Sequence, residues 1–234
     1  MSSADRLIVA LDVESSDRAR ELVDQLSPHV SWFKLGSVLF TREGPEICRI
    51  VKSAGARLFL DLKFHDIPNT VYGAVTSAMG LDIDMLTIHT SGGQAMMEAA
   101  VRAREECGRS DVMIIGVTVL THLALEDFRQ LFASDRAPED TVLALTRTAQ
   151  DAGLDGVVAS AKELTLIKRF AGPDFKVVTP GIRLADGSTD DQARVVTPGR
   201  AIRDGADYLV VGRPVIAADD PVDACQKILA DMTG

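Results

Sequence analysis

The stretch "RLFLDLKFHDIPNT", residues 57–70, contains one complete passage from a strand into a helix. It begins with an apolar run that is typical of a strand buried on both faces. Asp61, Lys63 and Asp66 follow, and Pro68 stands where proline is favoured, in the first turn of a helix. Charges at the end of a buried strand are costly to desolvate, so they indicate a function at this end of the strand.

The same order of apolar run and amphipathic segment recurs along the whole chain. Seven further runs rich in Val, Ile and Leu lack strict polar alternation, as strands of a buried parallel sheet do. Segments such as 17–26 and 45–55 separate them and have the apolar spacing of helices. These repeats predict an α/β protein, a (β/α)8 barrel of one domain, 1–234, with an extra helix in the long insertion at about 121–155. A doubly wound sheet is the alternative, although it usually has fewer strands. The predicted strands are 7–12, 31–36, 57–63, 85–90, 113–120, 156–160, 176–182 and 208–213.

The charge, the cysteine spacing and the length of the apolar runs indicate which partners and which cellular location the protein has. The net charge of −9 and the lack of Lys/Arg clusters interleaved with aromatic residues argue against a nucleic-acid partner. Cys48, Cys107 and Cys225 lie far apart without a C-x-x-C spacing, which indicates neither a zinc site nor a disulfide framework. The apolar runs are too short for a signal peptide or a membrane span. We therefore expect a cytoplasmic protein with no membrane partner.

Polar residues accumulate at the carboxyl ends of the predicted strands. Barrel enzymes build their active sites at these ends, so the distribution predicts a site there. The residues concerned are Asp12, Lys34, Asp61, Lys63, His89, Thr121, Arg183 and Arg213.

The charges around residue 61 are expected to form an alternating chain. Residues two apart in a strand share a face, so Asp61 and Lys63 are predicted to point into the barrel, within reach of Lys34. Asp66 would extend the chain of opposite charges from the following loop. A structural salt-bridge network is one alternative. A magnesium site formed by Asp12, Asp61 and Asp66 is another, which the two lysines oppose.

The last two predicted strands lead into a positively charged region. Gly212 allows close approach to the backbone, and Arg213 can form a forked pair with a phosphate group. Arg183 and Gln192 flank a segment rich in Gly, Ser, Thr and Asp. Loops after strands seven and eight commonly bind phosphate in this architecture, although an ordinary surface loop with a solvated arginine remains the alternative.

The chain resembles the orotidine 5'-phosphate decarboxylases, the last enzymes of de novo UMP synthesis. "DLKFHDIPNT" (61–70) looks like the signature of that family, and the resemblance extends over nearly the whole chain. The further motifs, in family order, are "VALD" (9–12), "FKLG" (33–36), "TIHTSGG" (87–93), "VTVLT" (117–121), "TPGIR" (179–183) and "VGRPV" (211–215).

The resemblance implies a reaction and an assembly. It implies decarboxylation of orotidine 5'-phosphate to UMP and CO₂ by a homodimer that uses neither metal nor organic cofactor. Lys63 would be the proton donor to C6 of the pyrimidine. Lys34, Asp61 and Asp66 would complete the catalytic array, with Asp66 and Thr70 contributed across the dimer interface.

The resemblance also implies a set of substrate contacts. Asp12 and Lys34 would hold ribose hydroxyls, and Thr121 would contact the base near its amide edge. The other implied binding residues are Asp61, Lys63, Asp66, Ile67, Thr70 and Pro180, with Arg183, Gln192, Gly212 and Arg213 at the 5'-phosphate.

Two other classes of protein share parts of this pattern. Magnesium-dependent barrel enzymes that act on sugar phosphates share the D-x-K-x-x-D spacing of residues 61–66, but have an acidic metal ligand where this chain has Lys34. A non-catalytic nucleotide-binding barrel would keep the phosphate loop without needing both lysines. The complete set of two lysines and two aspartates argues against the second class.

Overall fold

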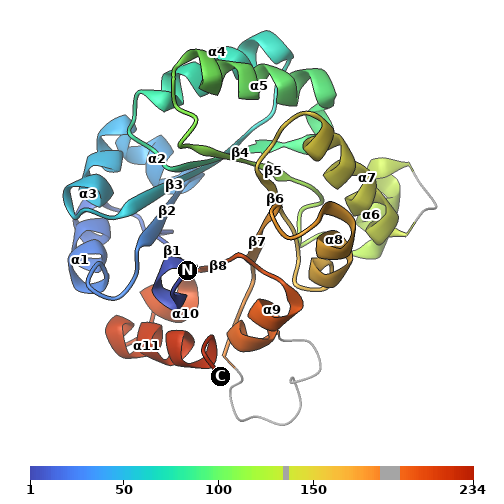
Figure 1. Ribbon diagram of the computed structural model, residues 1–234. Helices are drawn as coiled ribbons and strands as arrows, with labels where there is room; N and C mark the ends of the chain where they lie inside the picture. The colour runs from blue at the N-terminus through green and yellow to red at the C-terminus, as the bar shows by residue number, and fades with distance from the viewer. Residues whose placement is uncertain (134–136, 185–195) are drawn as a thin grey trace.

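The fold is a closed parallel barrel of eight strands in sequence order (Figure 1), seen in a computed structural model that describes residues 1–133, 137–184 and 196–234. Because β1 pairs with β8 as well as with β2, the sheet has no edge, which confirms the predicted barrel and excludes a doubly wound sheet. The predicted residue Gln192 lies outside the described residues. The strands are β1 (Leu7–Ala10), β2 (Trp32–Gly36), β3 (Arg57–Phe64), β4 (Met85–His89), β5 (Met113–Val117), β6 (Gly156–Val158), β7 (Lys176–Pro180) and β8 (Tyr208–Val211).

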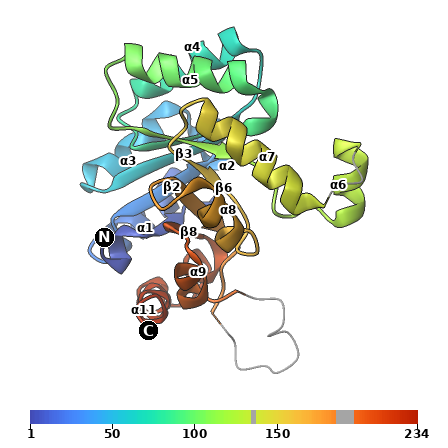
Figure 2. The same ribbon diagram turned by 45° about the vertical axis from the view of Figure 1, so that its right-hand side comes forward.

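Helices surround the barrel and connect successive strands (Figure 1). The predicted extra helix between β5 and β6 is present as α6, which lies beyond the outer ring of helices (Figure 2). The helices are α1 (Ser16–Leu26), α2 (Ser37–Glu43), α3 (Cys48–Ser53), α4 (Pro68–Met79), α5 (Gln94–Glu106), α6 (Leu125–Phe132), α7 (Pro138–Asp151), α8 (Leu164–Ala171), α9 (Pro198–Asp204), α10 (Arg213–Ile216) and α11 (Pro221–Asp231), with short 3₁₀ turns at Ser3–Asp5, Pro45–Ile47 and Thr90–Gly92.

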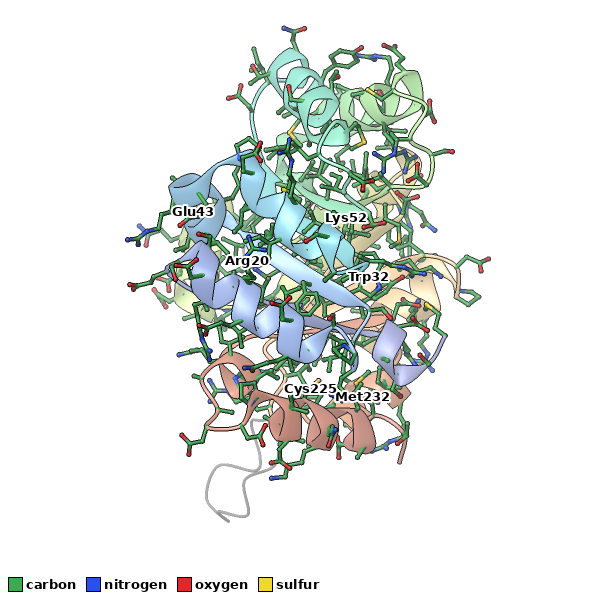
Figure 3. The ribbon with its side chains drawn as sticks, turned by 90° about the vertical axis from the view of Figure 1, so that its left-hand side faces the viewer. Arg20, Trp32, Glu43, Lys52, Cys225 and Met232 are labelled. Atoms are coloured by element: carbon green, nitrogen blue, oxygen red, sulfur yellow. The ribbon has the colours of Figure 1, made fainter. Side chains whose placement is uncertain are left out.

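The helix boundaries follow from local side-chain chemistry. Ser15 accepts a hydrogen bond from the Arg18 backbone N–H at the start of α1, as an N-cap residue does. Pro68 opens α4, where its missing N–H is not needed. Figure 3 shows α1, α3 and α11 side by side on one flank, and Cys225 of α11 is completely buried there. This flank illustrates how each helix covers the barrel with one apolar face.

Several strands end earlier than the sequence predicts. β1 ends at Ala10 rather than at Asp12, and β5 ends at Val117 rather than at Leu120. The residues that follow leave the sheet and form loops around the carboxyl ends of the strands. Asp12 and Thr121 are therefore loop residues, and their side chains line a cavity instead of continuing the strand pairing.

The core has two parts, one between the barrel and the helices and one inside the barrel. The inner cluster fills the lumen toward the amino-terminal ends of the strands, so the opposite end remains available for a site. Its buried members are Ile8, Trp32, Phe59, Met85, Ile115, Val178 and Tyr208. Across the described part of the chain, we find no helix with the length and apolar character that a membrane span requires.

Candidate active site

A cavity of about 1040 Å³ opens at the carboxyl ends of the strands. Its floor is apolar, and includes Phe59, Val158 and Val210 from three different strands. Polar and charged side chains stand above this floor, which is the arrangement of a ligand site in a barrel enzyme. The predicted site residues that line the cavity are Asp12, Lys34, Asp61, Lys63, Thr121, Pro180, Arg183, Gly212 and Arg213.

Asp61 stands between two lysines at the base of this cavity. Its Oδ1 lies 2.7 Å from Lys63 Nζ, and its Oδ2 lies 3.4 Å from Lys34 Nζ. The Asp61 side chain is 12% exposed and that of Lys34 is 9% exposed, so these charges are largely removed from water. Burial alone would raise the pKa of Asp61, but the two ammonium groups and the hydrogen bonds from Lys63 and Thr87 outweigh it and lower that pKa. Asp61 is therefore ionised at neutral pH, and its carboxylate is the shared counter-charge of both lysines.

Asp12 extends the charged group on the side of Lys34. Its Oδ1 lies 3.1 Å from Lys34 Nζ, while half of its side chain, 51%, remains exposed to a ligand. Gly36 allows this pair to form, because a Cβ at that position would lie 2.9 Å from Lys34 Nζ and 3.0 Å from Asp12 Oδ1. The pair can thus offer an acceptor and a donor to the same polar group of a ligand.

The predicted alternation along β3 is only partly correct. Leu62 and Phe64 do pack against the main core, as expected for side chains on the outer face. However, the pairing of β3 with β4 shifts between Leu60 and Phe64, and Lys63 has a left-handed backbone with φ of 52°. Lys63 therefore reaches Asp61 from an irregular backbone, which side-chain periodicity does not predict.

Two arginines occupy another part of the cavity wall. Arg183 follows β7, and Arg213 follows Gly212 at the end of β8. Both are exposed, and they bring positive charge to the cavity of an otherwise acidic chain. The loops after the seventh and eighth strands are the usual phosphate site of this fold.

Asp66, Ile67 and Thr70 lie at the start of α4, outside the cavity lining. All three are exposed, and Ile67 has 67% of its surface accessible. Asp66 Oδ1 accepts a hydrogen bond of 2.7 Å from the Ile67 backbone N–H rather than meeting Lys63. Within one chain, the array thus joins Lys63, Asp61, Lys34 and Asp12, and the contribution of Asp66 across an interface stays a prediction.

The sequence did not single out Thr87, although it touches the charged group. Its Oγ1 lies 2.9 Å from Asp61 Oδ1. The available signal was a hydroxyl within the apolar run "MLTIH", at a position that alternation directs into the barrel. The apolar floor of the cavity was also missed, because its residues resemble any other strand core.

The fold and the cavity together define a (β/α)8-barrel enzyme with lysines, carboxylates and arginines converging on one site. A family model described as "Orotidine 5'-phosphate decarboxylase / HUMPS family" matches residues 5–228. The chain belongs to this family, which confirms the resemblance seen in the sequence motifs.

Curated relatives and solved structures agree with this assignment. An orotidine 5'-phosphate decarboxylase of Moorella thermoacetica is 48% identical, over 99% of this chain and 94% of its own. One of Syntrophotalea carbinolica is also 48% identical, over 97% of this chain and 94% of its own. The crystal structure of orotidine 5'-phosphate decarboxylase from Lactobacillus acidophilus has a TM-score of 0.86 and 33% identity, covering 98% of this chain and 100% of its own. These relatives place the chain among the carboxy-lyases.

Proposed function

We propose that the chain decarboxylates orotidine 5'-phosphate to UMP and CO₂ without a metal or an organic cofactor, as a step of pyrimidine biosynthesis. The observation that carries the proposal is the largely buried Asp61 between the ammonium groups of Lys34 and Lys63. The names of the close relatives support the substrate. The free cysteines Cys48, Cys107 and Cys225 support a reducing compartment, and we infer the cytoplasm.

The substrate would be held at both ends of the cavity. Arg183 and Arg213 would bind the 5'-phosphate, with Gly212 allowing close approach of the backbone. Asp12 and Lys34 would bind ribose hydroxyls, since Asp12 remains half exposed. The remaining proposed contacts are Thr121 at the base, Pro180 in the cavity wall, and Gln192 at the phosphate.

Lys63 would act at the reacting carbon. When the bond between C6 and the carboxylate breaks, its electron pair stays on C6 in an orbital that the ring cannot readily delocalise, and CO₂ leaves. Opposite unit charges about 3 Å apart attract each other by roughly 5 kcal/mol at an effective dielectric constant of 20. A fixed ammonium group beside C6 therefore stabilises the charge as it develops. Lys63 then transfers a proton to C6, which gives UMP, and takes up a proton from water.

The carboxylates would hold that ammonium group in place. Asp61 orients Lys63 through the 2.7 Å contact between Asp61 Oδ1 and Lys63 Nζ. In a homodimer, Asp66 of the second subunit would contact Lys63 from the other side, and Ile67 and Thr70 would accompany it into the shared site. The exposure of all three residues in one chain supports this assignment.

The position of Lys34 also argues against a magnesium-dependent reaction. Mg²⁺ is bound through carboxylate oxygens with substrate and water completing its shell. Here Lys34 Nζ is already in contact with Asp12 Oδ1 and Asp61 Oδ2. A cation bound to those two carboxylates would be repelled by Lys34, so this pair favours chemistry by lysine.

The direct test is an absorbance assay of orotidine 5'-phosphate with the purified protein, with and without EDTA. We expect the orotate absorbance to disappear at the same rate in both, with UMP as the product. Lys63→Ala should abolish turnover while UMP binding remains measurable, because Lys63 acts on C6 rather than on the phosphate. No loss of absorbance with the wild-type protein, or full dependence on added Mg²⁺, would reject the proposal. An equal loss of UMP binding and turnover in Lys63→Ala would show that this residue is structural.

A further inference from the structure

The backbone of β3 is irregular where it carries the charged residues. Between the pairs Leu60–Leu86 and Phe64–Ile88, the three residues 61–63 of β3 face a single residue of β4, Thr87. Such a bulge removes regular ladder hydrogen bonds and redirects the side chains on the longer strand. Lys63 in addition has φ of 52°, a left-handed conformation that residues other than glycine seldom adopt. Something outside the regular ladder must hold this backbone.

The Thr87 hydroxyl takes the place of the missing strand partner. The Lys63 backbone N–H donates to Thr87 Oγ1 over 3.0 Å, and Thr87 Oγ1 donates to Asp61 Oδ1 over 2.9 Å. The direction of both bonds is fixed, since an N–H can only donate and the hydroxyl proton must then go to the carboxylate. Asp61 Oδ1 also accepts the 2.7 Å bond from Lys63 Nζ. One hydroxyl thus joins both the backbone of Lys63 and the counter-ion of its ammonium group.

We propose that Thr87 is a positioning residue, whose hydroxyl fixes the Lys63 backbone and the Asp61 carboxylate so that the Lys63 ammonium group points at the reacting carbon. Thr87 has no exposed surface and lies behind the cavity wall, so it acts through Lys63 and Asp61 rather than on a ligand. The consequence for catalysis rests on the proposed decarboxylation, whereas the geometric role does not.

Three variants separate the hydroxyl from the rest of the side chain. Thr87→Val keeps the shape and removes the hydroxyl, and Thr87→Ser keeps the hydroxyl and removes the methyl group. Thr90→Val is the matched control: Thr90 is also buried and lies just after β4, but its Oγ1 donates to the Val117 carbonyl oxygen, outside the charged group. Far-UV circular dichroism and UMP binding check that each variant is folded.

We expect kcat of Thr87→Val to fall about 10- to 100-fold, as for loss of a hydrogen bond to a charged group. Its KM and its affinity for UMP should change less than about threefold, because the ligand contacts remain. Thr87→Ser and Thr90→Val should keep kcat within about threefold of the wild type. If Thr87→Val does not fold, Thr87→Ala carries the same expectation, since it removes the hydroxyl without setting a methyl group against Asp61.

The pH profile gives a second readout that a packing role would not change. The hydrogen bond from Thr87 contributes to lowering the pKa of Asp61, so its loss raises that pKa. The acid limb of kcat should therefore move to higher pH in Thr87→Val and stay in place in Thr87→Ser. A Thr87→Val enzyme with more than a third of the wild-type kcat, or a Thr87→Ser enzyme as slow as Thr87→Val, overturns the catalytic part of the inference.

Crystal structures of Thr87→Val and Thr87→Ser test whether Thr87 positions Lys63, and this test does not depend on any activity measurement. In Thr87→Val, Lys63 should leave the left-handed region or its Nζ should move out of hydrogen-bond distance of Asp61. In Thr87→Ser, both features should persist. If Lys63 is unchanged in Thr87→Val, Thr87 does not position it. If the wild-type protein fails to decarboxylate, the proposed function falls, and these structures still decide whether Thr87 holds Lys63.

Discussion

At the scale of single residues, the phosphate contact can be separated from the chemistry. Arg213 is the first residue of α10 and lines the cavity, whereas Lys63 belongs to the charged group at its base. A residue that binds only the phosphate should raise kcat/KM for a phosphorylated substrate and have almost no effect on kcat/KM for the free nucleoside.

We predict that Arg213→Ala lowers kcat/KM for orotidine 5'-phosphate by about 10- to 100-fold, as expected for one charge-assisted hydrogen bond. Its kcat/KM for orotidine, which lacks the phosphate, should hardly change. Steady-state assays with both substrates measure this difference. Arg49→Ala is the control, because Arg49 is paired with Glu46 on the outer surface and is 81% exposed. Equal losses with both substrates would mean that Arg213 does not act on the phosphate.

At the scale of the elements, an aspartate clamp repeats around the amino-terminal end of the barrel. An aspartate stands immediately before each of β4, β6 and β8. Its carboxylate accepts a hydrogen bond from a backbone N–H of the preceding strand and forms an ion pair with a Lys or Arg side chain of an earlier helix. The backbone contact measures 2.7 Å in all three cases. The clamps join Asp84 to Leu58 and Lys52, Asp155 to Ile114 and Arg104, and Asp207 to Val177 and Lys168.

The first pair of strands is built differently. Ser31 stands before β2, where the other pairs have aspartate, and its hydroxyl donates to Asp5 Oδ1 over 2.8 Å. The three aspartate clamps therefore brace later strand pairs at the end opposite to the cavity. Their effect should fall on stability rather than on turnover.

We predict that Asp207→Ala lowers the free energy of unfolding by about 2–4 kcal/mol, because the Val177 backbone N–H loses its acceptor and the largely buried Lys168 ammonium group loses its counter-charge. Lys168 and Asp207 lie 2.6 Å apart, with side chains only 18% and 15% exposed. Urea denaturation measures the change, and kcat of the folded variant should stay close to the wild type.

Asp223→Ala provides the matched control for that measurement. Asp223 and Lys227 are also 2.6 Å apart, but their side chains are 54% and 63% exposed. Water and salt screen such a pair, so its loss should hardly change stability. If both variants lose the same stability, burial is not what makes the clamp effective.

At the scale of the whole molecule, the proposed active site combines residues of two chains. Asp66, Ile67 and Thr70 are exposed and lie outside the cavity of their own chain. A large exposed isoleucine beside an exposed aspartate at the start of α4 is a surface that a second copy of the chain can cover. The shared site that we propose can be tested by mixing two inactive variants.

We predict that Lys63→Ala and Asp66→Ala rescue each other when they are refolded together in equal amounts. In a mixed dimer, one site carries both defects and the other receives Lys63 and Asp66 from different subunits. With random pairing, half of the dimers are mixed and each has one intact site, so activity should return to about a quarter of wild type. Each variant refolded alone is the control. A flat result, with mixed dimers confirmed by mass spectrometry, would reject the shared site while leaving the decarboxylase assignment intact.

The sequence alone determined the barrel and brought three residues of the charged group together, namely Lys34, Asp61 and Lys63. Apolar runs with polar residues at their carboxyl ends fixed the order of strands and the end that carries the site, since parallel strands bring those ends together. Lys34 and Asp61 could be assigned to one group because they stand at the ends of neighbouring strands, and Lys63 because it follows Asp61 by only two residues. The structure has all three in contact, although Lys63 reaches Asp61 from an irregular backbone.

Only the tertiary structure decided how Lys63 is held and what lies behind it. The bulge in β3 and the left-handed Lys63 break the alternation that the sequence suggests, and they depend on a hydrogen bond to Thr87, which lies 24 residues further along the chain. The early strand ends and the position of Asp66 away from the cavity likewise depend on how the loops close. The spacing of apolar residues along a strand predicts which face of the sheet a side chain occupies. A hydrogen bond between residues far apart in the sequence forms only after the barrel has brought them together.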